Sequence, residues 1–387
     1  MNYKVPFVGY KLQYQNLKKE IDDAIQGVLK RGDLILRKDV EDFEKNFSSF
    51  VGKKYGIGVG CCTDALFLSL FGAGIGKGDE VITVSHTYVA TIDTIWRVGA
   101  KPILVDVGED MEMDPNLIEK AITSRTKAIV PVHLDGRMSD MGKIMKIAKK
   151  YNLIVIEDAA QAIGAKFKES AGWRKAGSFG LTSCFSFYPA KLLGSFGDAG
   201  MICTSDRKLA QKLYLLRDHG EKPSYLRTKK DKDKIAFFGF NSLLDNIQAA
   251  VLNVKLKYLP RWIKRRREIA GIYHQGLEKI KEIVLPVPPT NQGSYFDVYQ
   301  NYIIRAKNRN DLEKYLEKRG VETLVKWRIP NHLQPGLKLS RFKLSQTEKI
   351  SNEVISLPIY PELTNRQIRY VVKCVKDFYR GLVSVSS

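Results

Sequence analysis

Lys191 is the residue whose surroundings point most directly to chemistry. It follows a strand-like apolar run, Leu181 to Phe187, which stops at Pro189, and a glycine-rich stretch comes after it. An amine that leaves an apolar strand toward the protein interior is desolvated, which lowers its pKa toward the range in which it acts as a nucleophile or forms a Schiff base. The opposing interpretation is a surface charge, because the chain has 63 lysine and arginine residues.

A second cluster supplies a carboxylate that complements this amine. The run from Leu153 to Gln161, LIVIEDAAQ, predicts a buried parallel strand with Glu157 and Asp158 at its carboxyl end, where open α/β sheets place their ligands. A buried carboxylate needs a cationic partner. The protonated ring nitrogen of pyridoxal phosphate would be such a cationic partner. Proteins hold this cofactor with a Schiff-base lysine and with an acid beside the ring nitrogen. Alone, Asp158 is as well explained as a helix cap.

A third cluster predicts a phosphate site. The strand Tyr55 to Val59 ends in glycine, and Thr63 and Asp64 open a stretch with apolar residues at helical spacing. Free amides at a helix start bind phosphate. Ser186 adds a hydroxyl from the strand that presents Lys191. The alternative interpretation is that Thr63 is a plain N-cap.

The order of several blocks indicates a family. They are, along the chain, TDAL, TYVAT, AIVPVHLDG, VIEDAAQAIGA, FSFYPAKLLGSFGDAG, LRDHG, NSLLDNIQAAVLNVKL and ISLPIYPELT. With these blocks the chain resembles, over nearly its whole length, the DegT-type family of sugar-nucleotide aminotransferases. The resemblance implies an aspartate-aminotransferase-like fold of type I and pyridoxal phosphate as cofactor, with pyridoxamine phosphate as intermediate. It also implies amino transfer from L-glutamate, which leaves 2-oxoglutarate, to a nucleotide-diphosphate ketosugar for amino-sugar and polysaccharide synthesis.

The resemblance further implies roles for single residues. Lys191 and Asp158 are the expected catalytic residues: Lys191 holds the cofactor and moves a proton, and Asp158 keeps the ring nitrogen protonated. Tyr88 is expected to stack on the cofactor ring, and Gln161 to lie near the ring hydroxyl. The full expected cofactor set is Thr63, Asp64, Tyr88, Asp158, Gln161, Ser186, Lys191 and Asn241.

The family implies a homodimer with shared active sites, in which Asn241 reaches the phosphate from the partner subunit. The alternatives stay open: Tyr88 is also compatible with a core aromatic, and Gln161 and Asn241 with hydrogen bonds at helix starts.

The sugar-binding half departs from the family pattern. The common HYPxPxH block appears as Lys326-Trp-Arg-Ile-Pro-Asn-His332, with lysine and tryptophan replacing histidine and tyrosine. We expect Lys326, Arg328 and His332 to contact the substrate, either its diphosphate or the glutamate carboxylate. A solvated loop of the small domain is the alternative.

Two other functions remain open. A dehydratase that uses the same cofactor is expected to have a histidine in place of Lys191. A non-catalytic regulatory homologue keeps the fold but need not keep Lys191, Asp158, Gln161 and Ser186 together. The sequence leaves undecided the nucleotide, the sugar and whether carbon 3 or carbon 4 is aminated.

Length and composition predict two domains. The chain has 387 residues, 44% of them hydrophobic, enough for a large core, and we place a pyridoxal-phosphate-binding domain at 1–250 and a smaller one at 251–387. The five cysteines include no CxxC pair and the histidines lack metal-ligand spacing, so we expect no metal and a reducing, cytoplasmic compartment. No run of about 18 apolar residues is present, which predicts no membrane span.

The net charge of +21 raises the question of nucleic acid. Basic runs occur at 227–234 and 261–267, but no nucleic-acid motif accompanies them. We therefore expect a solvated basic surface and no nucleic-acid partner. Such a surface also attracts a diphosphate-bearing substrate.

Strand and helix patterns alternate from Val81 to Thr204, which predicts a mostly parallel sheet sandwiched by helices. From Asn241 to Leu277 the spacing is helical, with Pro260 as an interruption, and this segment is expected to link the domains. The remainder reads as a smaller C-terminal α+β domain with a strand Tyr299–Arg305, a helix Asn310–Arg319 and a strand Val321–Val325.

Overall fold

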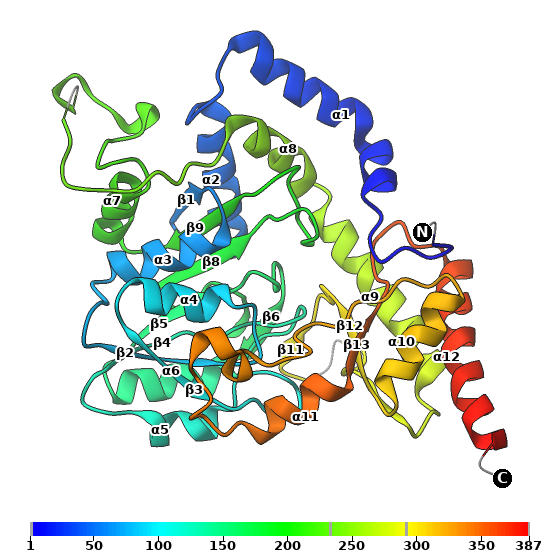
Figure 1. The fold of residues 1–387 in the computed structure, drawn as a ribbon. Helices are drawn as coiled ribbons and strands as arrows, with labels where there is room; N and C mark the ends of the chain where they lie inside the picture. The colour runs from blue at the N-terminus through cyan, green and yellow to red at the C-terminus, as the bar shows by residue number, and fades with distance from the viewer. Residues whose placement is uncertain (1–2, 232–233, 291–292, 386–387) are drawn as a thin grey trace.

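A seven-stranded sheet contains all the strands expected before residue 205 (Figure 1). The computed structural model describes residues 3–231, 234–290 and 293–385. The strand order is β1-β9-β8-β5-β4-β2-β3. β9 is antiparallel to both of its neighbours, and the other pairs are parallel, which confirms the mostly parallel α/β sheet. The strands are β1 Tyr55–Val59, β2 Glu80–Val84, β3 Lys101–Val105, β4 Thr126–Ile129, β5 Ile154–Asp158, β8 Thr182–Ser186 and β9 Gly200–Thr204.

Helices cover both faces of this sheet, because successive strand residues bury in opposite directions. Val155 packs in one hydrophobic cluster and Ile156 in another, and Phe185 and Cys184 divide in the same way. One cluster includes residues of α2 Lys38–Val51, α6 Met141–Lys150 and α8 Asn246–Leu256. The other includes residues of α3 Cys62–Gly72, α4 Ala90–Arg97 and α7 Arg207–Leu216.

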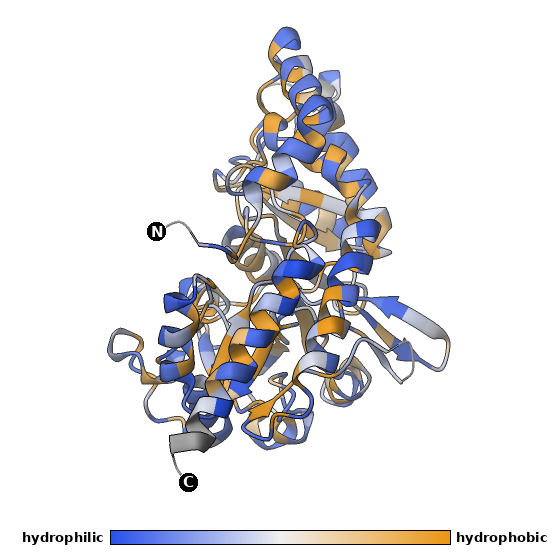
Figure 2. Ribbon diagram, turned by 90° about the vertical axis from the view of Figure 1, so that its right-hand side faces the viewer, coloured by the Kyte–Doolittle hydropathy of each residue, from blue (hydrophilic) through white to orange (hydrophobic). Residues whose placement is uncertain are grey.

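The C-terminal part has its own antiparallel sheet, β10-β12-β13. Its elements are β10 Ile283–Val284, β12 Tyr302–Ala306, β13 Val354–Leu357, α9 Leu259–Leu277, α10 Arg309–Lys318, α11 Ser345–Glu353 and α12 Asn365–Val385. Hydrophilic and hydrophobic residues alternate along the helix that ends at the C-terminus, as expected for a helix with one buried face (Figure 2).

α9 runs from one core to the other. Leu259 and Trp262 belong to the larger cluster, whereas Ile269 and Tyr273 belong to the C-terminal one. The placement of a domain boundary near residue 250 stays a prediction.

Several elements were not anticipated from the sequence. Among them are α1 Tyr10–Arg31 and a small antiparallel sheet of β11 Tyr295–Phe296, β6 Lys166–Glu169 and β7 Gly172–Lys175. The short helix α5 Ile118–Ala121 follows the helical turn Pro115–Leu117, whose N-cap is Asp114. Residues 232 and 233 of the basic run lie outside the described residues. In the described part of the chain, no helix combines the length and apolarity needed to cross a membrane.

Two local expectations and one alternative interpretation were wrong. The helix expected from Asn241 begins only at Asn246, because Asn241 bridges to Asp218 in extended conformation. α3 is capped by the Cys61 sulfur, which accepts from the Asp64 amide at 3.4 Å, so Thr63 is not the N-cap.

The strand expected at 321–325 forms only isolated bridges. Val321 pairs with Val5, whereas Leu324 already pairs with Ser356 of β13, so the segment changes partners before a ladder can form.

A buried ion pair holds β1 in place. Arg217, with no exposed surface, pairs with Glu44 of α2, and both bind Gly58 of β1. The Glu44 Oε1 accepts from the Gly58 amide at 2.8 Å, and Arg217 donates to the Gly58 carbonyl at 2.6 Å. Tyr225 completes the cluster by donating to Glu44 Oε2 at 2.8 Å. Arg217 of the LRDHG block is thus part of a structural ion pair.

We predict that Glu44→Leu lowers the free energy of unfolding by about 3–5 kcal/mol, because it leaves Arg217 buried without a countercharge. The double variant Glu44→Leu, Arg217→Met should recover part of this loss. Urea unfolding of the parent, single and double variants measures it. Asp377→Ala, which breaks an exposed pair on α12, is the control and should change little. A double variant less stable than Glu44→Leu would contradict the prediction.

Candidate active site

Lys191 lies in a turn after β8, and its backbone is held on both sides. Its amide donates to the Tyr188 carbonyl at 2.8 Å. The side chain of Gln300 donates to the Ala190 carbonyl at 2.9 Å and accepts from the Leu192 amide at 2.6 Å. One side chain from the C-terminal part therefore bridges the two residues that flank Lys191. The sequence analysis missed Gln300, since no motif connects it to a turn so distant along the chain.

The Lys191 amine is desolvated, as expected. Burial, and to a smaller extent the nearby charge of Lys326, lower its pKa to about 8, although Cys62, Asp158 and Asp135 act in the opposite direction. The residue as a whole is only partly buried, so the desolvation concerns the amine rather than the entire side chain. A lowered pKa makes the neutral, nucleophilic form available near neutral pH.

Asp158 ends β5 with its carboxylate buried. Its Oδ2 accepts from the Thr91 hydroxyl at 2.8 Å, and its Oδ1 accepts from the Ala160 amide at 3.2 Å. Burial raises the pKa of Asp158, although these hydrogen bonds and the charge of Lys191 oppose the shift. Thr91 is itself hydrogen-bonded to Thr87 at 2.9 Å. The carboxylate keeps acceptor capacity for a further, cationic partner.

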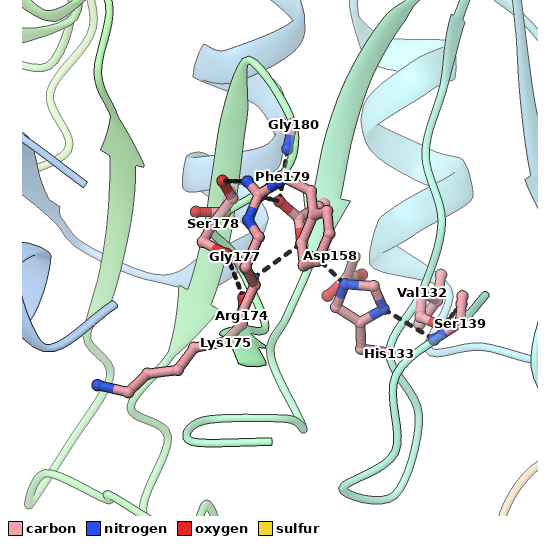
Figure 3. Close-up of polar contacts among 12 residues, drawn as sticks. Val132, His133, Ser139, Asp158, Arg174, Lys175, Gly177, Ser178, Phe179 and Gly180 are labelled. Carbon is pink, nitrogen blue, oxygen red and sulfur yellow. Dashed lines mark hydrogen bonds and ion pairs between the residues drawn. The ribbon is translucent and has the colours of Figure 1, made fainter. Parts of the chain in front are cut away.

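The neighbouring Glu157 has a different role, and Figure 3 shows residues that bind it, among them His133, Gly177 and Phe179. Its carboxylate accepts from the backbone amides of Gly177, Phe179 and Gly180 at 2.6 to 2.8 Å and from His133 Nε2 at 3.0 Å. Burial raises its pKa, but the hydrogen bonds from His133 and Gly180 outweigh burial, so the pKa lies below its usual value. Glu157 thereby anchors the loop that leads into β8.

The residues expected to bind the phosphate lie where β8, β9 and α3 meet. Ser186 pairs with Gly200 across the sheet, and a Cβ on Gly200 would lie 2.4 Å from the Cys61 backbone, directly before α3. Only glycine permits this approach. Asp64 accepts from the Ser242 hydroxyl at 2.7 Å. Ser186 and the start of α3, which includes Thr63, are thus brought together.

Tyr88 precedes α4 and is 62% exposed, which excludes the alternative of a core aromatic. The segment Ser85 to Thr87, directly before it, is hydrogen-bonded to the C-terminal part of the chain. The Asn331 side chain donates to the Ser85 and Thr87 carbonyls at 3.0 and 2.7 Å. The ring of Tyr88 is therefore exposed, whereas the backbone directly before it is held by Asn331.

The three residues expected at the substrate are not brought to one place. Lys326 lies beside Gln161, with its Nζ 3.1 Å from Gln161 Oε1. Arg328 instead pairs with Glu313 of α10 at 2.5 Å.

His332 is fully buried, with its Nδ1 2.8 Å from the Ser85 hydroxyl and its Nε2 3.2 Å from Glu348. The expectation that His332 contacts the substrate is therefore corrected, because both of its ring nitrogens are engaged within the fold. It anchors the 326–332 loop.

Comparison with known proteins decides the family. The model of the DegT/DnrJ/EryC1/StrS aminotransferase family matches residues 15–376. The chain belongs to this family. It is 41% identical over 380 residues to a "Pleiotropic regulatory protein" of Geobacillus stearothermophilus, which covers 97% of this chain and 99% of that protein. It is also 41% identical to the dTDP-3-amino-3,6-dideoxy-alpha-D-galactopyranose transaminase of Aneurinibacillus thermoaerophilus, with 97% and 99% covered.

A solved member has the same fold. The crystal structure of S. venezuelae DesV in complex with a ketimine intermediate superposes with a TM-score of 0.90 at 38% identity, covering 97% of this chain and 98% of DesV. Family membership confirms the resemblance drawn from the sequence, the enzyme class of aminotransferase and the type I fold. It also confirms the cofactor, pyridoxal phosphate.

The residues of this chain fit that cofactor. A desolvated amine, a buried carboxylate with spare acceptor capacity and a glycine-lined helix start are arranged around the ends of β5 and β8. Asn241 is exposed, and Ser242 beside it contacts Asp64 in the same chain. The roles assigned to single residues remain predictions.

We predict that covalent capture of pyridoxal phosphate by the apoprotein follows the neutral form of Lys191. Because the pKa of Lys191 is about 8, the capture rate should rise about tenfold per pH unit below pH 7 and level off above the pKa. Stopped-flow absorbance measures this rate, and Lys191→Ala is the control without a covalent band. A rate that keeps rising toward pH 10 would indicate an ordinary, solvated lysine.

Proposed function

We propose that this protein is a pyridoxal-phosphate-dependent aminotransferase that moves an amino group from L-glutamate to carbon 3 of a nucleotide-linked 3-keto sugar. The observation that carries the proposal is the desolvated amine of Lys191 beside the buried carboxylate of Asp158. Carbon 3 is supported by the relative that is named a 3-amino-sugar transaminase at 41% identity. The nucleotide and the configuration of the sugar stay open.

Each residue of the site has a task in this reaction. The cofactor, when bound, supplies an electron sink that stabilises negative charge on the carbon that loses a proton. The Lys191 amine, neutral near its pKa of about 8, accepts that proton and returns it. Asp158 holds a proton on the ring nitrogen, since a buried carboxylate stabilises a cationic partner. Ser186 and the start of α3 bind the phosphate.

The test is a two-step reaction. Purified protein loaded with pyridoxal phosphate should lose its visible absorbance on adding L-glutamate, and should then aminate one member of a panel of dTDP- and UDP-linked 3-keto and 4-keto sugars. Mass spectrometry and NMR identify the product. Lys191→Ala should form none. Amination at carbon 4 alone would overturn the proposed position, and no reaction with any keto sugar would overturn the proposed substrate class.

A regulatory function is the second candidate, because a relative at 41% identity is named a pleiotropic regulatory protein. The structure keeps Lys191, Asp158, Ser186 and Gln161 in the arrangement described above, which a purely regulatory protein does not need. The presence of a lysine at position 191 also argues against a dehydratase, in which a histidine is expected at this position. Loss of the visible band with glutamate separates catalysis from mere cofactor binding.

We further propose that the enzyme is a homodimer with shared active sites, in which Asn241 completes the phosphate site of the partner chain. The support is that Asn241 is exposed and follows a segment with exposed apolar side chains. Phe238 is 99% and Ile235 is 67% exposed, and a second copy of the chain would cover them.

We predict complementation between a Lys191→Ala chain and an Asn241→Asp chain, whose new carboxylate repels the phosphate. Each variant alone is inactive, but a mixed dimer has one site with both native residues. Random reassortment of equal amounts makes about half of the dimers mixed, and hence about a quarter of all sites competent. Activity after joint refolding measures this fraction. No gain, although mass spectrometry detects mixed dimers, would show that Asn241 acts within its own chain.

A further inference from the structure

The side chain of Gln161 is surrounded by hydrogen-bond donors beside the active-site lysine. Its Oε1 accepts from the Asp135 backbone amide at 3.3 Å, from Asn301 Nδ2 at 3.3 Å and from Lys326 Nζ at 3.1 Å. A backbone amide and an ammonium can only donate. The oxygen of the Gln161 amide must therefore face this cluster, and its Nε2 must face the opposite way.

The donor cluster is itself fixed by an ion pair. Lys326 Nζ lies 2.9 Å from Asp135 Oδ1, and Asn301 Nδ2 donates to the same oxygen at 2.6 Å. Both charged side chains are largely buried, with 15% of Lys326 and 10% of Asp135 exposed. Asp135 adopts a left-handed backbone with φ of 52°, which non-glycine residues rarely do. Strain of this kind persists only where neighbouring contacts hold it.

A lysine at position 326 is well suited to hold Asp135 and Gln161 together. Its amine nitrogen donates to Asp135 and Gln161 at once. The common family block has a histidine at this position, which offers at most two donors on a rigid ring. Lys326 also raises the positive potential near Lys191, on which the carboxylates of Asp158 and Asp135 act in the opposite direction.

We propose that Lys326 is a positioning residue of the cofactor site. Together with Asp135 and Asn301 it fixes the Gln161 amide so that Nε2 donates to the ring hydroxyl oxygen of pyridoxal phosphate. The ammonium is engaged by Asp135 and Gln161 rather than left free for a substrate anion. This assignment rests on the proposed function only in that pyridoxal phosphate is the group that Gln161 serves.

The arrangement has a spectroscopic consequence. A hydrogen bond to the ring oxygen stabilises its anionic form most when the linkage to Lys191 carries no proton. Loss of the Gln161 donor should therefore raise the pH midpoint of the holoenzyme's visible absorbance change by about one to two units, the size of one hydrogen bond to a charged group. Removal of the Lys326 charge alone also raises the midpoint, so the two causes must be separated.

A double-mutant cycle separates them. Holoenzymes of the parent, Gln161→Ala, Lys326→Met and the double variant are titrated by absorbance from pH 5 to 10. If Lys326 acts through Gln161, Lys326→Met shifts the midpoint by less than half as much in the Gln161→Ala background as in the parent. Equal shifts in both backgrounds would overturn the proposal, because the lysine would then act by charge alone.

Two further variants complete the experiment. Asn301→Ala removes a neutral donor and should raise the midpoint without a change of charge, and it keeps the test open if Lys326→Met does not fold. An unchanged midpoint in Asn301→Ala would count against the cluster. Lys373→Met, on the exposed face of α12, is the matched control and should leave the midpoint unchanged. The titration needs the cofactor but no keto sugar, so its outcome is independent of whether the proposed substrate is correct.

Discussion

The desolvation of the Lys191 amine is the constraint on which the rest of the site depends. A charged amine is costly to bury, so burial shifts the equilibrium toward the neutral form that chemistry requires. The turn that carries the lysine must then be rigid, since a mobile side chain would return to water. Gln300 supplies this rigidity through hydrogen bonds to the backbone on either side of Lys191. The lowered pKa of Lys191 therefore depends on the fixed geometry of the turn that carries it.

The C-terminal part of the chain contributes to the active site as much as the large sheet does. Gln300 holds the lysine turn, Asn301 next to it reaches Gln161 and Asp135, and Lys326 binds the same pair. Asn331 and His332 bind the segment before Tyr88, so the 326–332 loop is connected to the large sheet part of the molecule. The arrangement of side chains around Lys191 and Gln161 therefore depends on contacts between both parts of the chain.

The sequence predicted the central sheet well because its strands are short apolar runs, buried on both faces. The burial of the two side-chain groups could be predicted because Asp158 ends one such strand and Lys191 lies in the turn after another; their roles in catalysis stay predictions. The contacts of Gln300 and Asp135 could not, since a pairing between distant side chains leaves no local pattern. Motif position alone also misled: His332 matches the family block, yet it is buried against Ser85 and Glu348.

The two adjacent acids of β5 show why the structure was needed to assign roles. Side chains alternate along a strand, so Glu157 and Asp158 face opposite sides of the sheet. Glu157 meets three backbone amides and His133, and its pKa falls despite burial. Its acceptor sites are taken up by the protein.

Asp158 receives one hydroxyl and one amide, and its pKa rises. A carboxylate that is buried but only partly satisfied is stabilised by any cation that enters beside it. The cofactor's ring nitrogen becomes such a cation on protonation. The fold supplies fewer donors to Asp158 than to Glu157, and this difference supports the proposal that Asp158 is the acid that faces the cofactor.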